Sequence, residues 1–84
     1  MPVVNATADG AWTLAHTQGL AAGSVDVELK SEGAVVWRRG TGTPAEDVGY
    51  DMPVHSRLAV AMSPNEKLYA RSLDGKAATV LIDG

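Results

Sequence analysis

The hydrophobic and polar residues of this 84-residue chain alternate with a period of two over much of its length, and no segment shows a helical period. The clearest example is Ser24–Lys30, whose three aliphatic residues share one face while its three charged residues share the other. Such alternation is typical of a β-strand with one face buried and one face in water. The pattern therefore predicts an all-β protein.

The end of the chain, Asn65–Asp83, is predicted to form a β-hairpin. Residues 67–72 alternate, Asp74-Gly75 is a turn dipeptide, and residues 77–82 form a second run rich in β-branched and apolar residues. The second arm is apolar on both faces, so it is predicted to be a central strand that is covered on both sides. A second strand pair is predicted between Ser24–Lys30 and Ala34–Arg39.

Further strands are predicted around these. Residues 1–8 form either an N-terminal arm or an edge strand, and Ala11–Thr17 and Val54–Met62 are strand-like. Residues 40–53 are rich in glycine, proline and acids, which favours a long loop that crosses from one sheet to another. Six to seven short strands in a single domain, 1–84, predict a small antiparallel β-sandwich or a partly open β-barrel.

The size of the chain limits its core. A domain of this length buries only about 60% of the surface that its unfolded chain exposes. The chain has no Phe and only two Trp and two Tyr, so aliphatic residues must fill the core. Small domains compensate with disulfides, metals or oligomerisation, and the absence of cysteine excludes disulfides and thiolate metal sites. We therefore expect a homo-oligomer, or a chain that docks onto a larger body.

The charge pattern argues against some classes of partner. The net charge is −3, and Arg38-Arg39 is the only basic pair, whereas a nucleic-acid-binding protein shows a basic patch or stripe. No apolar run is long enough to span a membrane, and the first residues lack the basic region of a signal peptide. We expect no nucleic acid and no membrane as partners, and synthesis in a cytoplasm.

Candidate chemistry is sparse. His55-Ser56 has no Gly-x-Ser-x-Gly motif near it, so we predict that the protein is not an enzyme and has no catalytic residues. His16 and His55 lack the spacing of metal ligands, so no metal and no cofactor are predicted. Trp12 and Tyr50, with Asp9 or Asp51, leave open a carbohydrate platform.

The most suggestive cluster is Trp37-Arg38-Arg39. Trp37 has two interpretations: it stacks on a ligand or partner, or it fills a core that is short of large side chains. The second is favoured. For Arg38 and Arg39 we favour a contact with a partner, because arginine is enriched at protein interfaces.

One part of the chain also has a familiar pattern. A loop with Pro44, Gly49 and Pro53 leads into a strand, and a Leu-Tyr-Ala-Arg-Ser strand, Asp74-Gly75 and the small-residue strand Ala77–Ile82 follow. In these features Gly40–Asp83 resembles the small β-sandwich virion proteins of tailed bacteriophages, which include capsid decoration (cement) proteins and other auxiliary structural proteins.

The resemblance implies a structural role. Such proteins bind the outer capsid surface as homo-oligomers, often trimers, and bridge subunits of the major capsid protein, commonly with a terminal arm. The expected partner contacts are Pro2, Val3 and Val4 from the arm, with Arg38 and Arg39 added from the charge pattern. The expected location is the virion, after synthesis in the host cytoplasm. Two alternatives stay open: a neck, tail or fibre-associated structural protein, and a carbohydrate or cell-surface binding module.

Overall fold

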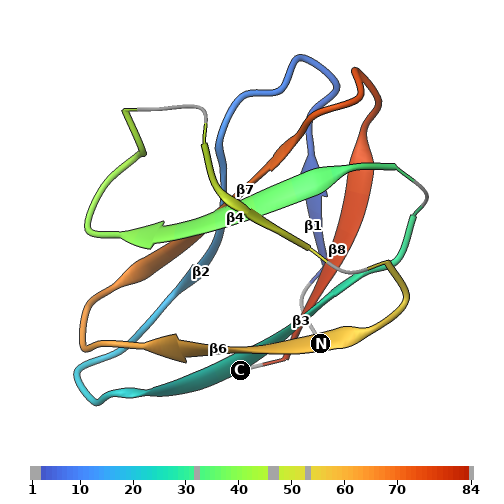
Figure 1. The fold of residues 1–84 in the computed structure, drawn as a ribbon. Helices are drawn as coiled ribbons and strands as arrows, with labels where there is room; N and C mark the ends of the chain where they lie inside the picture. Colours follow the sequence, from blue (N-terminus) through green and yellow to red (C-terminus); the bar gives the residue numbers. More distant parts are fainter. Residues whose placement is uncertain (1–2, 32, 46–47, 53, 84) are drawn as a thin grey trace.

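The computed structural model describes residues 3–31, 33–45, 48–52 and 54–83 (Figure 1). Over these residues the chain forms β-strands and no helix, which confirms the predicted all-β class. The strands are β1 (Val3–Ala6), β2 (Thr13–Thr17), β3 (Gly23–Leu29), β4 (Val35–Gly40), β5 (Tyr50–Asp51), β6 (Arg57–Met62), β7 (Lys67–Ser72) and β8 (Ala78–Asp83). The strand that brings the number above the predicted six to seven is β5, which lies within the segment predicted to be a loop.

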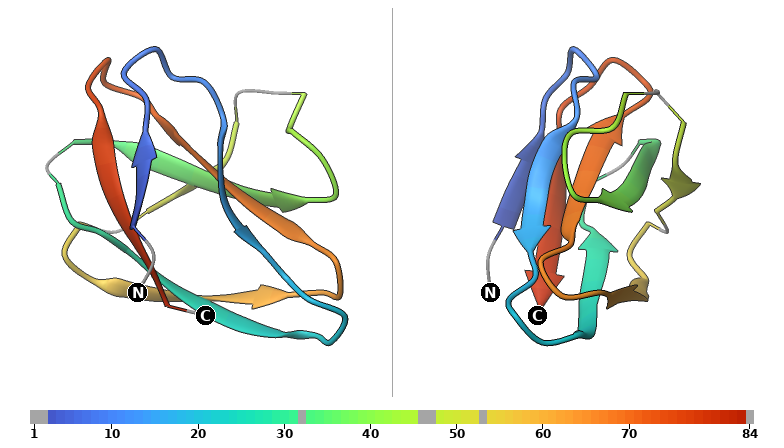
Figure 2. Two further views of the ribbon diagram at one scale, coloured as in Figure 1. Left: turned by 180° about the vertical axis from the view of Figure 1, so that it is seen from behind. Right: turned by 90° about the vertical axis from the view of Figure 1, so that its left-hand side faces the viewer.

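The strands form two four-stranded sheets that pack as a β-sandwich (Figures 1 and 2). Sheet A has the order β1-β8-β3-β6, and sheet B has the order β2-β7-β4-β5. All of these neighbouring strands pair antiparallel. The predicted small antiparallel sandwich is therefore confirmed.

Both predicted strand pairs are wrong. β7 lies in sheet B and β8 in sheet A, and β3 and β4 are likewise divided between the sheets. Of the pairs of described strands that follow each other directly in the chain, only β4 and β5 lie in the same sheet. The physical reason is that successive strands turn their apolar faces toward one another across the core, instead of extending one sheet side by side.

The chain changes sheets at corners where two loops run together. At one corner Gln18 N–H donates to Glu66 O (2.8 Å) and Asn65 N–H donates to Gly19 O (2.9 Å). At another, Leu73 N–H donates to Ala34 O (2.9 Å). At both of these corners two loops pair with each other, so their turn residues bend the chain between sheets rather than back along one sheet.

The core is aliphatic. Its buried residues are Ala6, Val25, Val27, Leu29, Val35, Met52, Val60, Met62, Leu68, Ala70, Ala78, Val80 and Ile82. β8 lies inside sheet A between β1 and β3, so its predicted central position is confirmed. On its outer face Thr79 and Leu81 are half-buried, so this chain covers that face of β8 in part.

Asp74 organises the corner between β7 and β8. Its carboxylate accepts from Lys76 N–H (3.1 Å) and Ala34 N–H (3.3 Å), and the hydroxyl of buried Ser72 lies 2.9 Å away. The hydrogen bond from Ser72, then that from Lys76, lowers the pKa of Asp74. Gly33 has a φ of 123°, and a side chain there would collide with this carboxylate. One ionised side chain thus ties two corner loops together.

Replacing Val80 with Asp should abolish folding, because the change puts an unpaired charge at a fully buried position between the sheets. The matched control is Thr79→Asp, one residue away on the outer face of the same strand, which should still fold. Circular dichroism melting compares the two variants. A cooperative, native-like transition for Val80→Asp would contradict the core assignment.

Asp74→Asn should destabilise the protein at neutral pH and flatten its acid dependence. A lowered pKa means that the folded state favours the carboxylate, so this stabilisation is present above the ordinary value of 3.8. It is lost as the pH falls through the folded value. Urea unfolding of the natural protein and of Asp74→Asn, at several pH values across this range, gives the difference between their free energies of unfolding. The contributions of the groups that the two proteins share, such as Asp9, cancel in this difference. A difference that does not shrink in acid would refute this role.

Candidate functional site

The Trp37-Arg38-Arg39 cluster that the sequence singled out lies toward the end of β4, near one edge of the sandwich. Trp37 packs against the core from the inner face of sheet B, in agreement with its predicted core role, and remains half-buried. The ring of Tyr50, from β5, lies against it at a centroid distance of 4.9 Å. The Arg39 guanidinium lies 5.9 Å from the Trp37 ring, and its Nη1 donates to Ala61 O of β6 at 2.6 Å. Arg39 therefore links the two sheets at this edge.

Arg38 points to the other face of sheet B and borders a groove. Its Nη1 donates to Val48 O (3.2 Å), which fixes the segment that leads into β5. Arg38, Val48, Gly49 and Tyr50 line a depression of about 260 Å³. A second hollow of about 340 Å³, lined by Arg38, Arg39 and residues 40–45, adjoins it. We call these two hollows with their lining residues the arginine groove.

The arginine groove combines charge with exposed apolar surface. Val48 and Tyr50 are 67% and 63% exposed and line the first hollow with Arg38, while Arg39 lines the second hollow with Arg38. Each of the two guanidinium groups donates one described hydrogen bond. Arginine and tyrosine are enriched at protein interfaces, and both are common among the residues that contribute most to binding. The groove is therefore suited to a protein surface that offers carboxylates within an apolar setting.

A second apolar layer covers the outer face of sheet B. Val36 and Tyr69 are only 4% and 6% exposed, although neither belongs to the core between the sheets. Trp12 lies on this face near Val36, and the Arg71 guanidinium is 5.8 Å from the Trp12 ring. Val36 is therefore covered by residues of this chain itself.

Gly49 fits where no larger residue does. A Cβ at this position would lie 2.7 Å from Trp37 O, 3.1 Å from the Trp12 ring and 3.2 Å from the Val36 Cβ. The close approach holds the segment before β5 against both the outer layer and the strand that carries the arginines. Gly49 therefore couples the outer layer to the shape of the groove.

The other predicted partner contacts lie elsewhere. Val3 is exposed on the outer face of β1, Val4 packs against the core, and Pro2 lies outside the described residues. β1 is at one edge of sheet A, whereas β6, which Arg39 contacts, is at the opposite edge. The structure thus does not bring the two predicted contact regions together.

The carbohydrate platform that the sequence left open is not assembled from Trp12 and Tyr50. Tyr50 pairs in register with Trp37 and stacks on it from the inner side of sheet B, while Trp12 lies on the outer side with Val36. Two aromatic rings on opposite faces of one sheet do not present a common flat surface to a sugar.

The two histidines lie at opposite ends of β3. His16 Nε2 lies 3.1 Å from Gln18 Oε1, ahead of the corner that leads into β3, whereas His55 N–H donates to Leu29 O at the far end of that strand. His55 and Ser56 are both exposed, and neither lines the arginine groove. Within residues 3–31, 33–45, 48–52 and 54–83 no group of three or more potential metal-ligating side chains is found. The same residues contain no helix able to cross a membrane.

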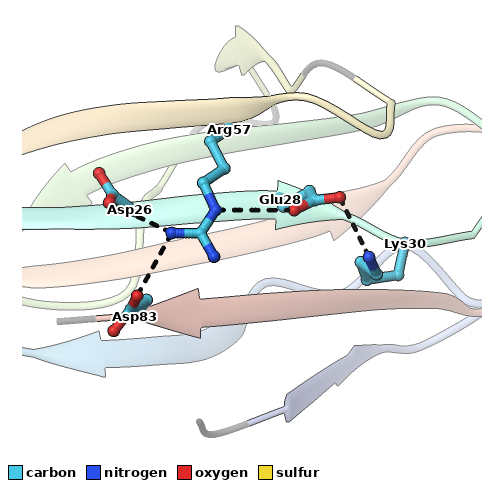
Figure 3. A network of polar contacts seen from close by, with 5 residues as sticks. All are labelled: Asp26, Glu28, Lys30, Arg57 and Asp83. Atoms are coloured by element: carbon cyan, nitrogen blue, oxygen red, sulfur yellow. Dashed lines mark hydrogen bonds and ion pairs between the residues drawn. The ribbon is translucent and has the colours of Figure 1, made fainter.

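Sequence reasoning missed a charged network on the outer face of sheet A (Figure 3). The Arg57 guanidinium contacts Asp83 (3.4 Å), Asp26 (3.7 Å) and Glu28 (4.0 Å), and Lys30 contacts Glu28 (3.1 Å). Asp26 and Asp83 are directly opposite each other on β3 and β8. Like charges in such a pair are destabilising, so Arg57 offsets their repulsion. Alternation placed Asp26 and Glu28 outward, but only the strand order brings Arg57 and Asp83 beside them.

No protein-family model, curated protein or solved structure matches this chain. The function must therefore be inferred from the surfaces of the sandwich and from the resemblance of Gly40–Asp83.

Gly49→Ala should destabilise the protein by about 1–3 kcal/mol, because the added methyl group overpacks a site bounded by backbone and two side chains. Gly42→Ala is the matched control, since no atom lies within 4 Å of its Cβ position, and it should be neutral or slightly stabilising. Urea unfolding of both variants gives the two free energies. Equal stability of the two variants would show that Gly49 is not held in this close approach.

Proposed function

We propose that this protein is a structural virion protein that decorates a tailed-phage capsid and stabilises it by bridging major capsid subunits. The observation that carries the docking role is the arginine groove on a sandwich edge, in which Arg38 adjoins exposed Val48 and Tyr50 in one hollow and Arg39 in the next. The virion assignment rests on the resemblance of Gly40–Asp83 to such proteins.

The physical basis of such a role is simple linkage. A protein that binds the assembled shell, and not its separate subunits, adds its binding free energy to the stability of the shell. A standard interface takes about 800 Å² from each partner. This chain exposes 4586 Å² in total, so one such interface would occupy roughly a sixth of its surface. Contacts with two neighbouring capsid subunits are thus compatible with its size.

The groove also defines the chemistry of the capsid surface it would bind. Arg38 and Arg39 retain guanidinium donors beyond the two that bind Val48 O and Ala61 O. Guanidinium groups bind carboxylates in two-pronged geometry. A patch with one or two acidic side chains among apolar residues, facing Tyr50 and Val48, is the complementary partner.

The direct test is the thermal stability of purified capsids from which this protein has been stripped. Adding the recombinant protein back should raise the melting temperature of the shell, and the protein should sediment with the shell. Unchanged melting at saturating protein would contradict the decoration role. A copy number per virion near that of the major capsid protein supports the shell, and a small number fixed by the tail axis would instead place the protein at the neck or tail.

Arg38→Glu combined with Arg39→Glu should weaken binding to the stripped capsids at least about tenfold, because contacts to carboxylates become repulsive. Lys76→Glu, in the turn at the opposite end of the sandwich from the groove, reverses one charge where the double variant reverses two, so it controls for the effect of charge reversal away from the groove. Circular dichroism checks that the variants fold. Undiminished capsid binding of the double variant would remove the arginine groove from the docking surface.

A further inference from the structure

The four sheet edges differ in how well they are protected. An exposed regular edge can pair with another chain, and proteins block this with bulges, charges, short strands or covering groups. β2 has an irregular register between Leu14 and His16, and β5 has only two residues. β6 begins with Arg57, and Arg39 binds its Ala61 carbonyl. β1 is also short, with four residues, but in the described part of the chain its edge carries no bulge, charge or covering side chain, and it pairs with β8 in an unbroken register.

The neighbouring strands show which backbone groups of β1 face outward. Thr79 N–H donates to Ser31 Oγ, and Thr79 O accepts from Lys30 N–H, so both groups of Thr79 point away from β1. Antiparallel strands alternate in this respect, so Ala78 and Val80 direct their groups to β1. Their partners Ala6 and Val4 therefore face β8. Val3 and Asn5 direct their N–H and C=O groups to the free edge.

These four groups are available for pairing. β1 has a single neighbour in sheet A, and no backbone hydrogen bond from Val3 or Asn5 to a loop is found among the described residues. In the right-hand view of Figure 2, β1 lies at the margin of the molecule. The edge thus presents two donors and two acceptors at the spacing of an antiparallel ladder.

We propose that β1 pairs antiparallel with β1 of a second copy of this chain, which joins the two A sheets across a two-fold axis. Val3 then lies opposite Asn5 of the second copy, Val4 opposite its own counterpart, and Asn5 opposite Val3. Each of the two Val3–Asn5 pairs supplies two hydrogen bonds, so the edge groups of both copies are satisfied. This inference does not depend on the proposed virion role.

Two observations select a second copy as the occupant. The strand is uncharged, so pairing it with itself opposes no like charges in a protein of net charge −3. Val4 is half-buried and packs against the core, so a facing Val4 extends that core across the axis. An edge of four residues buries little area, so the dimer is expected to be weak and concentration-dependent. A two-fold edge produces a dimer and not the trimer that the phage resemblance implies.

The test uses two substitutions at one position. Asn5→Pro removes an edge N–H, which proteins tolerate on the unpaired side of an edge strand. Asn5→Ala keeps that N–H, and both variants lose the 3.3 Å contact of Thr79 Oγ1 with the Asn5 side chain. Sedimentation over a dilution series should show a dimer for the natural chain and for Asn5→Ala. Asn5→Pro should weaken dimerisation about tenfold or more.

A second readout keeps the test decisive if Asn5→Pro is poorly folded. Val3→Lys leaves the ladder to β8 intact and places two positive charges at the dimer edge, so it should also weaken association. Exchange of the Val3 and Asn5 amides in the natural chain should slow as concentration rises. A chain that stays monomeric at every concentration, or a dimer that persists in both Asn5→Pro and Val3→Lys, would overturn the proposal.

Discussion

The packing of two aliphatic sheet faces across a thin core is the interaction on which the rest of this protein depends. No aromatic side chain is fully enclosed between the sheets in the described part of the chain, so small residues such as Val25, Val80 and Ala70 must interlock closely. The chain achieves this by placing successive strands in opposite sheets. Two of the corners then hold the sheets together locally, with Asp74 and the paired loops as the connecting groups.

Because the core lies between the sheets, the outer faces and the edges of the sandwich are the surfaces on which a partner can bind. The outer face of sheet A is occupied by Arg57 and its acidic partners, and the outer face of sheet B is covered by Trp12 over Val36. Two edges present groups that can bind a partner. One is the arginine groove beside β5, with its guanidinium groups, and the other is the unpaired side of β1, with its backbone N–H and C=O groups. They lie at opposite margins of the sandwich, so the two proposals use separate surfaces and neither excludes the other.

Much of the fold could be predicted from local pattern, and its topology could not. Alternation placed Val25, Val27 and Leu29 inside and Asp26 and Glu28 outside, because period two is a property of the strand alone. The same pattern does not say whether Asp74-Gly75 folds a hairpin or a corner, since both need a turn with a left-handed glycine. The choice depends on contacts between distant loops. For the same reason Arg38 and Arg39 could be singled out from the sequence, whereas Gly49 and Tyr50, which shape the groove around them, could not be placed there.

The alternation of successive strands between two sheets is the central claim, and it is tested most directly by amide–amide nuclear Overhauser effects across strands. Contacts from β8 should connect it to β1 and β3, and contacts from β7 should connect it to β2 and β4. A continuous series of such contacts between residues 67–72 and 78–83 would instead mean that the two strands form one hairpin, which would contradict the division of β7 and β8 between the two sheets.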